Sequence, residues 1–374
     1  VSHFLHAHFL WFLLASYLVA AVWPAVGLWI RDISLGEVGI GKERMRVTLP
    51  MLMLALLLLN AGLGVKTSRV LGLLRTAPLL GIGLAANLLI PSACIFGVSQ
   101  VMRRWHEPEE VQNLLVGLAL VASMPIAGSS TAWSQNNNGS MVVSLGLVLL
   151  STLLSPLTTP VALHSIGLMA SGSYATVLHS LAARGAGTFL TACVVVPALL
   201  GILGRMIVGG PKIDVAKPQL KLANSVNLLL LNYSNASISL PRVFAEPDWD
   251  FLAVTLGFAV ALCLLAFASG WWLGRLLRAE PDQRIALTFG LGMNNNGTGL
   301  VLASLALAHL PQVMLPIIFY NLVQHLVAGG VSWLLYRRSG DRDSSGLDSM
   351  QATAEAPRED GGLERRKLEG SRTG

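Results

Sequence analysis

The stretch LGMNNNGTGL, from Leu291 to Leu300, places three adjacent asparagines between glycines inside an otherwise apolar segment. A helix that crosses a bilayer must satisfy its own backbone, and a dense run of glycines and amides interrupts that helix. Such a break is tolerated in a membrane only where the freed backbone groups line a protein-enclosed or watery cavity. We therefore predict that this segment is a discontinuous membrane-spanning helix with a binding site at its break.

The composition of the rest of the chain is also that of a membrane protein. Of 374 residues, 53% are hydrophobic and only 12% are charged, and the mean hydropathy is +0.62. Soluble domains carry about 25% charged residues. A helix needs about 20 apolar residues to cross the hydrocarbon core. Ten segments meet this need, which predicts an all-α membrane protein with ten transmembrane helices: 9–30, 47–65, 76–100, 111–134, 139–168, 178–208, 219–242, 250–275, 284–309 and 311–336.

A second break and two echoes predict an internal repeat. The fourth segment is interrupted at PIAGSST (Pro125–Thr131), as the ninth is at its asparagines. ALLLLN, ending at Asn60, returns as NLLLLN, ending at Asn232, an offset of 232 − 60 = 172 residues. NNNGS from Asn136 returns as NNNGT from Asn294, an offset of 294 − 136 = 158 residues. Two halves of five spans, about 9–168 and 178–336, would enter the membrane in opposite senses, the inverted-repeat plan of many secondary transporters.

Charge sets the expected orientation and the domain boundary. The predicted loops on the side of the N-terminus carry twelve Lys and Arg residues, among them Lys66, Arg69 and Arg75, against eight on the other side. The positive-inside rule then predicts that both termini lie in the cytoplasm of a cell whose inner membrane holds the protein. The tail 339–374 is polar and is predicted to be disordered, so the transmembrane domain would be 1–338. The net charge of +6 comes with no basic run interleaved with aromatics, so no nucleic-acid partner is expected.

The acidic residues restrict the substrate. Every Asp and Glu lies in a predicted loop, at a span end or in the tail, so no carboxylate sits at mid-membrane. An organic cation would have no counter-charge there, whereas the N-terminus of a half-helix has a positive dipole end that suits an anion. Three unpaired cysteines in apolar spans are expected to be core residues. We therefore predict a carrier of a neutral or anionic substrate, with a small organic anion as the leading candidate, and with no enzymatic activity and no cofactor.

Two long segments resemble the bile acid:sodium symporter family. ASMPIAGSSTAWSQNNNGSMVVSLGLVLLSTLLSPLTTP (Ala122–Pro160) is similar to its fourth and fifth spans, and LTFGLGMNNNGTGLVLASLAL (Leu287–Leu307) to its ninth. NAGLGVKTSRV (Asn60–Val70) is similar to the end of its second span. The resemblance implies ten helices in two inverted five-helix repeats, arranged as a panel and a core domain, with spans 4 and 9 discontinuous and crossing. It also implies transport of a small or amphipathic organic anion, with Na⁺ as the coupling ion.

The same resemblance implies site residues. The positions that match sodium ligands are Ser130, Thr131, Ser144, Met293, Asn294 and Asn87. Those that match or adjoin the substrate cavity are Asn295, Gln324, His325, Ile126 and Gly128. Two positions depart from the family: Gly290 stands where a Glu is shared by both sodium sites, and Val148 where a Thr ligand is usual. Because both ligands are missing, we predict weak or absent sodium dependence.

Three other interpretations are open at this point. GSSTA (Gly128–Ala132) fits the G-x-S-x-A pattern of an intramembrane serine hydrolase, which would need Ser130 Oγ within hydrogen-bond distance of a His325 nitrogen. The absent Glu at Gly290 is compatible with a sensor of the same fold that binds ligand without transporting it. The related arsenite exporters share the architecture but resemble the chain less, because Met124–Ile126 stand where they carry a Cys. Substrate identity, direction of flux and oligomeric state do not follow from the sequence.

Overall fold

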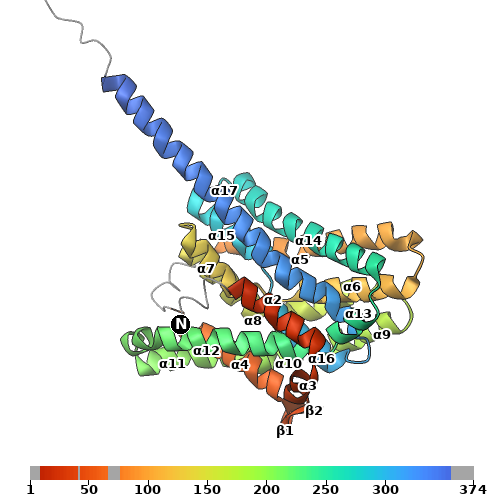
Figure 1. Ribbon diagram of the computed structural model, residues 1–374. Helices are drawn as coiled ribbons and strands as arrows, with labels where there is room; N and C mark the ends of the chain where they lie inside the picture. The colour runs from red at the N-terminus through yellow and green to blue at the C-terminus, as the bar shows by residue number, and fades with distance from the viewer. Residues whose placement is uncertain (1–8, 41–42, 66–75, 355–374) are drawn as a thin grey trace, which may run out of the picture. The chain divides into compact units, whose positions relative to one another are not determined.

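The protein is helical over almost all of the residues that its computed structural model describes, which are 9–40, 43–65 and 76–354 (Figure 1). Its elements are α2 (Phe9–Val22), α3 (Ala25–Asp32), β1 (Ser34–Ile40), β2 (Glu43–Thr48), α4 (Leu49–Leu63), α5 (Ala77–Val101), η2 (Met102–Arg104), α6 (Pro108–Ser123), α7 (Ser129–Asn136), α8 (Met141–Gly167), α9 (Gly172–Ser180), η3 (Leu181–Gly185), α10 (Ala186–Leu190), η4 (Thr191–Val195), α11 (Val196–Val208), α12 (Gly210–Ala236), α13 (Leu240–Ala245), α14 (Trp249–Leu276), α15 (Pro281–Gly292), α16 (Asn296–Ala306), η5 (Pro311–Val313) and α17 (Met314–Ala354). Lys66, Arg69 and Arg75, which entered the orientation prediction, lie outside the described residues.

Helical backbone occupies each of the ten predicted segments, but fewer helices qualify as spans by length and hydropathy. Within the described ranges five do so: 77–104, 141–167, 186–208, 249–276 and 311–337; the bent pair α2–α3 would make a sixth. The segments around α6–α7 and α15–α16 fall short because each is interrupted, and α4 because it has only 15 residues. The structure is thus that of an all-α membrane protein in outline, and the count of ten stays a prediction.

Two features of the first 50 residues differ from the sequence predictions. The first segment is not one straight span, because α2 and α3 meet at an angle of 93°, where Pro24 forms the N-cap of α3. The loop that follows folds into a β-hairpin, in which β1 and β2 pair antiparallel from Ser34–Thr48 to Ile40–Glu43. Valine, isoleucine and methionine alternate with charged or small residues there, a period of two that suits a strand. An all-α description therefore leaves out this hairpin.

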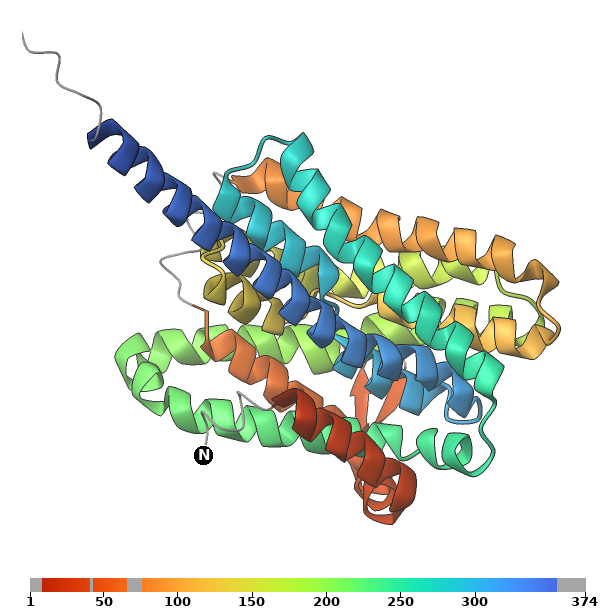
Figure 2. The same cartoon turned by 45° about the horizontal axis from the view of Figure 1, so that its top comes forward.

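The helices of residues 1–329 pack in two groups that both views of the chain show. One contains α4, α11 and α12, and the other α5, α8, α14 and α15 (Figures 1 and 2). Gly62 and Gly201 let α4 and α11 approach closely, since a Cβ on either would meet the other helix's backbone carbonyl. Two asparagines, one on each helix, join α4 to α12 reciprocally: Asn60 Nδ2 donates to Leu220 O (3.1 Å), and Asn227 Nδ2 donates to Met53 O (2.8 Å).

The C-terminal helix is longer than predicted. By its internal contacts the chain forms two units, Val1–Gly329 and Gly330–Gly374, and α17 begins in the first and ends in the second. Its backbone is helical to Ala354, where the composition predicts disorder from residue 339. Adding a residue to an existing helix fixes few dihedrals for each new hydrogen bond, so an apolar helix can extend into a polar segment. Residues 355–374 of the predicted tail lie outside the described residues.

Candidate functional site

The two segments predicted to be discontinuous are both broken, and the breaks cross. Between α6 and α7 the chain is extended at Ile126, and between α15 and α16 it is extended at Asn294; these two residues form an antiparallel β-bridge. Ala127 N donates to Met293 O (2.9 Å), and Asn295 N donates to Pro125 O (2.8 Å). Each break therefore satisfies backbone groups that the other leaves free, as a membrane interior requires.

Each of the two bridge residues, Ile126 and Asn294, is supported at its backbone amide by a side chain of the next long helix, α8 or α17. Ile126 N donates to Ser151 Oγ of α8 (3.1 Å), and Asn294 N donates to Gln324 Oε1 of α17 (3.1 Å). Gln324 Nε2 in turn donates to Asn321 Oδ1 (3.2 Å). Asn321 continues the buried chain of hydrogen bonds to Tyr17 OH of α2 (2.8 Å) and Asn232 Oδ1 of α12 (3.2 Å). The predicted substrate residue Gln324 thus holds the backbone of the ninth-segment break and ties it to two helices outside it.

The two half-helices that begin after the breaks have different N-termini. Asn295 is the N-cap of α16, and its Oδ1 accepts the Thr298 amide (3.2 Å). Gly128 is the N-cap of α7 and carries no capping side chain. It is exposed, and no atom lies within 4 Å of where its Cβ would be. The N-terminus of α7 thus lacks a side-chain cap and has open space beside Gly128, whereas the N-terminus of α16 is capped by Asn295.

Four of the predicted sodium ligands have a buried side-chain oxygen without a hydrogen-bond partner. They are Asn87 Oδ1, Ser130 Oγ, Ser144 Oγ and Asn294 Oδ1. Buried polar atoms are usually hydrogen-bonded, and most helical serines of this chain bond a carbonyl of the preceding turn, as Ser155 Oγ does with Thr152 O. The four atoms lie on α5, α7, α8 and at the α15–α16 break, elements that pack against one another. Unpartnered oxygens of this kind suit a cation or a water.

The other two predicted sodium ligands are already bonded within the protein. Thr131 Oγ1 donates to Gly128 O at 2.7 Å. The carbonyl of Met293 accepts the Ala127 amide in the crossing. A carbonyl oxygen has a second lone pair, so Met293 could still contact a ligand, but the hydroxyl of Thr131 serves the first turn of α7.

The position of the family's shared carboxylate is packed with hydrocarbon. A Cβ on Gly290 would lie 2.8 Å from Leu147 Cδ1, and one on Gly83 would lie 3.0 Å from Leu147 Cδ2. Leu147 is completely buried between these two glycines, in a cluster with Leu80, Ile126, Val143, Ala286, Leu287 and Leu291. Val148, where the family has a Thr ligand, packs against the same cluster. The volume that a sodium-binding Glu side chain would need is thus filled by a leucine.

The geometry does not form the serine–histidine dyad that a hydrolase needs. Ser130 Oγ is buried and has no hydrogen-bond partner, so no bond joins it to His325. His325 instead lies on α17 with its ring edge-on to Phe9 of α2, at a centroid distance of 6.0 Å. The predicted substrate residues Ile126, Asn295 and Gln324 meet at the crossing, Gly128 lies beside it, and His325 follows Gln324 in sequence.

Several polar residues at the centre of the molecule were missed by the sequence reasoning. Ser151, Tyr17, Asn232 and Asn321 support the crossing or extend its network, and none was predicted as a site residue. Asn235 of α12 is fully buried, and neither its Oδ1 nor its Nδ2 has a partner. A systematic search for amides and hydroxyls inside apolar segments would have found all five, because buried polar groups in membrane helices are expensive.

A carboxylate cluster lies at the start of α6, at the far end of that helix from the break. Oxygens of Glu110, Asp248 and Asp250 all lie within 4.8 Å of one another. Glu110 is 4% exposed and accepts a 2.6 Å hydrogen bond from Trp105 Nε1. Burial and a hydrogen bond with Asp248 raise the pKa of Glu110 to about 7. Hydrogen bonds with Asp250 and Glu110 lower the pKa of Asp248.

Comparison with known proteins identifies a family for the chain. Residues 7–335 match the SBF-like CPA transporter family, which covers most of the chain. The chain belongs to this family. It is also 27% identical over 226 residues to the Bacillus subtilis (strain 168) protein "Uncharacterized protein YbaS", a match that spans 60% of this chain and 69% of that protein. The resemblance to the bile acid:sodium symporter family is thereby confirmed, and this SBF-like protein is a multi-pass membrane protein of a transporter family.

Proposed function

We propose that this SBF-like protein is a secondary transporter that carries a small or amphipathic organic anion by alternating access, without obligatory coupling to sodium. The observation that supports this most directly is the crossing of two broken helices, with the uncapped N-terminus of α7 beside it. Half-helix N-termini at such breaks are the usual anion sites of secondary transporters. The sequence has no Asp or Glu from 111 to 213 or from 283 to 340, two ranges that include both breaks. No fixed negative charge in these ranges therefore opposes an anion.

The local correspondence of the two breaks supports an inverted repeat. The bridge partners Ile126 and Asn294 are each supported by the next long helix, through Ser151 and Gln324 respectively. The offsets are 294 − 126 = 168 and 324 − 151 = 173 residues, close to the 172 of the Asn60 and Asn232 echo. In the proposed cycle, α5, α8, α14 and α15 with the crossing form the core, and α4, α11 and α12 belong to the panel.

The proposal of sodium independence rests on Leu147. A shared carboxylate cannot occupy the Gly290 position while Leu147 fills it, and the oxygens of Asn87, Ser130 and Ser144 are neutral. Neutral oxygens alone bind a hard monovalent cation less strongly than a site that includes a carboxylate. Replacement of external sodium by potassium should therefore leave uptake unchanged in proteoliposomes.

Substitution of Asn295 tests whether an anion binds at the crossing. The purified full chain in proteoliposomes is screened for uptake of a panel of radiolabelled anions, from short carboxylates to bile-acid-sized amphipaths. Asn295→Ala removes the α16 cap, at about 1 kcal/mol, and should abolish uptake. Asn295→Asp keeps a capping acceptor, so the protein should remain as stable as wild type, yet its charge should repel the anion and also abolish uptake.

The outcomes separate the candidate functions. Wild-type uptake by the Asn295→Asp protein would show that no anion passes Asn295. Binding of an anion, measured by thermal shift, without any flux in either direction would favour the sensor. Uptake that collapses in potassium would refute sodium independence while leaving anion transport intact.

A further inference from the structure

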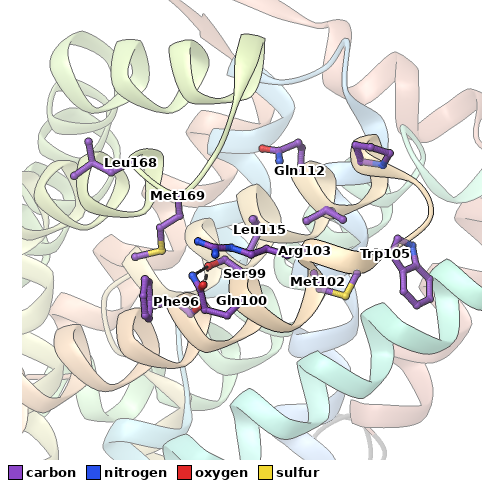
Figure 3. A pocket seen from close by; sticks show the side chains of 12 residues that line it. Phe96, Ser99, Gln100, Met102, Arg103, Trp105, Gln112, Leu115, Leu168 and Met169 are labelled. Atoms are coloured by element: carbon purple, nitrogen blue, oxygen red, sulfur yellow. Dashed lines mark hydrogen bonds between the residues drawn. The ribbon is translucent and has the colours of Figure 1, made fainter.

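A cavity of about 330 Å³ lies at one end of the core, away from the crossing. It is enclosed by the end of α5, by η2, by the start of α6 and by Leu168 and Met169 just beyond α8 (Figure 3). α5 and α8 are long apolar helices that end here, so the cavity lies where the hydrocarbon core gives way to headgroups. Trp105, which lines it, is the type of residue that anchors helices at that level.

Arg103 is the one charged side chain among the residues that line this cavity. Figure 3 shows it extended across the pocket between the helices, toward Ser99. Among the residues that the structure describes, none forms a salt bridge or a hydrogen bond with the Arg103 guanidinium, although Glu107 and Glu109 follow it closely in sequence. Gln112 uses its Oε1 to accept the Ser171 amide (2.9 Å), which leaves its amide hydrogens as further donors. The cavity thus offers a cation and uncharged donors, and no carboxylate lines it.

The rim of the cavity is apolar and exposed. Phe96 and Leu168 line it and are 52% and 72% exposed, and Met169 adds flexible hydrocarbon surface. At the end of a membrane helix such side chains face acyl chains rather than water. A ligand that fits has a compact anionic group for Arg103 and a hydrocarbon part beside Phe96 and Leu168.

We propose that this cavity binds the phosphate of an anionic phospholipid, with Arg103 as its principal ligand and the acyl chains lying along Phe96 and Leu168. A guanidinium donates paired, charge-assisted hydrogen bonds to phosphate oxygens, and basic pockets between membrane helices are suited to anionic headgroups. The exposed apolar rim favours a lipid over a soluble anion of the same headgroup chemistry. None of the residues that line the cavity belongs to the crossing, so lipid binding can be measured without the transported substrate.

Lipid titration of thermal unfolding tests the proposal on the full chain in detergent micelles. Short-chain phosphatidylglycerol should raise the unfolding temperature of the wild-type protein in a saturable manner, and native mass spectrometry should show one retained lipid. Arg103→Gln should weaken the apparent affinity by about tenfold or more. Arg104→Gln is the matched control, because Arg104 is exposed and adjacent but does not line the cavity, and it should behave as wild type.

A second variant keeps the test independent of charge. Met169→Trp should fill the cavity and abolish the lipid-dependent shift while Arg103 stays in place. The proposal is overturned if Arg103→Gln and Arg104→Gln respond alike, or if Met169→Trp binds lipid as wild type does. It is also overturned if inorganic phosphate at the same concentration gives the full shift, which would indicate a site for soluble anions.

Discussion

The two breaks at the centre of the protein are joined to each other, yet they present different surroundings to a ligand. At the fourth-segment break, α7 begins at Gly128 with no capping side chain and with open space beside it. At the ninth-segment break, α16 begins with its own Asn295 cap, and α15, which precedes the break, packs Gly290 against Leu147. Two different runs of small and polar residues, PIAGSST and GMNNNGTG, have thus produced one uncapped and one capped helix N-terminus.

This difference indicates how a fold with paired breaks can assign them different roles. The N-terminus of α7 has no capping side chain, and its Ser130 and Thr131 amides donate to Ala127 O (3.1 Å) and Gly128 O (3.2 Å). Its uncapped dipole end is the one suited to an anion in the proposed function. The capped α16 terminus and the leucine-filled space beside α15 contribute shape and support. In a protein with a carboxylate at Gly290, the second break would also be a cation site; here the hydrophobic cluster around Leu147 takes that volume.

The largest expected effect comes from restoring that carboxylate. Gly290→Glu forces Leu147 aside and places a charge among buried apolar side chains, so we expect a loss of stability of about 3 kcal/mol or more. Gly290→Ala, which needs only a small movement of the Leu147 side-chain end, is the control for volume. Thermal unfolding of the purified variants measures both, and equal stability of the two would show that the Gly290 environment is already polar.

Removal of Leu147 sharpens the same test. Gly290→Glu combined with Leu147→Ala opens space for the carboxylate near the unpartnered oxygens of Asn87 and Ser144. The double variant should unfold at a higher temperature in NaCl than in KCl, whereas the wild-type protein should not distinguish the two salts. A wild-type protein that is stabilised by NaCl alone would contradict the assignment of this space to hydrocarbon.

An intermediate effect is expected at the open terminus. Gly128→Leu adds a side chain into free space with an ordinary helical φ of −59°, so stability should be unchanged. If the anion occupies that space, its uptake should fall at least tenfold, about 1.4 kcal/mol. Gly257→Leu on α14 is a matched control, since that glycine is also exposed with nothing near its Cβ position, and it should transport normally. Equal uptake by both variants would place the substrate elsewhere.

The smallest effect concerns the starts of the two broken segments. α15 begins with a capping box of Glu280 and Gln283, whereas α6 begins with the buried Glu110. The pKa of Glu110 is raised from 4.5 to about 7 in the folded protein, so between these two values the folded state binds more protons than the unfolded state. Stability therefore falls as the pH rises through this interval and levels off above it. Glu110→Gln should remove that fall, on the order of 1 kcal/mol, when unfolding is compared at pH 5 and pH 8.

A partner variant tests the cause of this pH dependence. Asp248→Asn keeps the capping acceptor that bonds the Phe251 amide but removes the charge that helps to raise the pKa of Glu110. Its stability should therefore depend less on pH than that of wild type. If the free energy of unfolding depended on pH in the same way for wild type and Glu110→Gln, the pKa of Glu110 would not be raised by folding.

The sequence predicted those features that depend on local composition alone, namely the apolar helices and the two breaks in them. The asparagines of 294–296 and the Pro125–Gly128 run are breaks in any apolar helix, so both discontinuities could be predicted without knowing their neighbours. The bend at Pro24 and the hairpin of residues 34–48 were missed because a polar, charged loop gives no hydropathy signal and its short alternation is easily read as irregular.

Partners across the fold were beyond sequence reasoning. That Gly290 lacks a carboxylate is visible in the sequence, but that Leu147 fills the space depends on how α8 packs on α15. The cap formed by Asn295 and the support given by Gln324 depend likewise on a backbone geometry that only the crossing creates. Arg103 looked like an ordinary loop cation until the ends of α5 and α8 placed it in a cavity.

The reciprocal backbone bonds of Ala127 and Asn295 have a mechanical consequence. If one break slid past the other, the Ala127 and Asn295 amides would lose their acceptors in a membrane interior that offers no replacement. The two breaks are therefore expected to move together as one rigid unit. In the proposed transport cycle, the movement that opens a path to either side of the membrane would take place around that unit, near Tyr17, Asn232 and Asn321, which meet through side-chain hydrogen bonds.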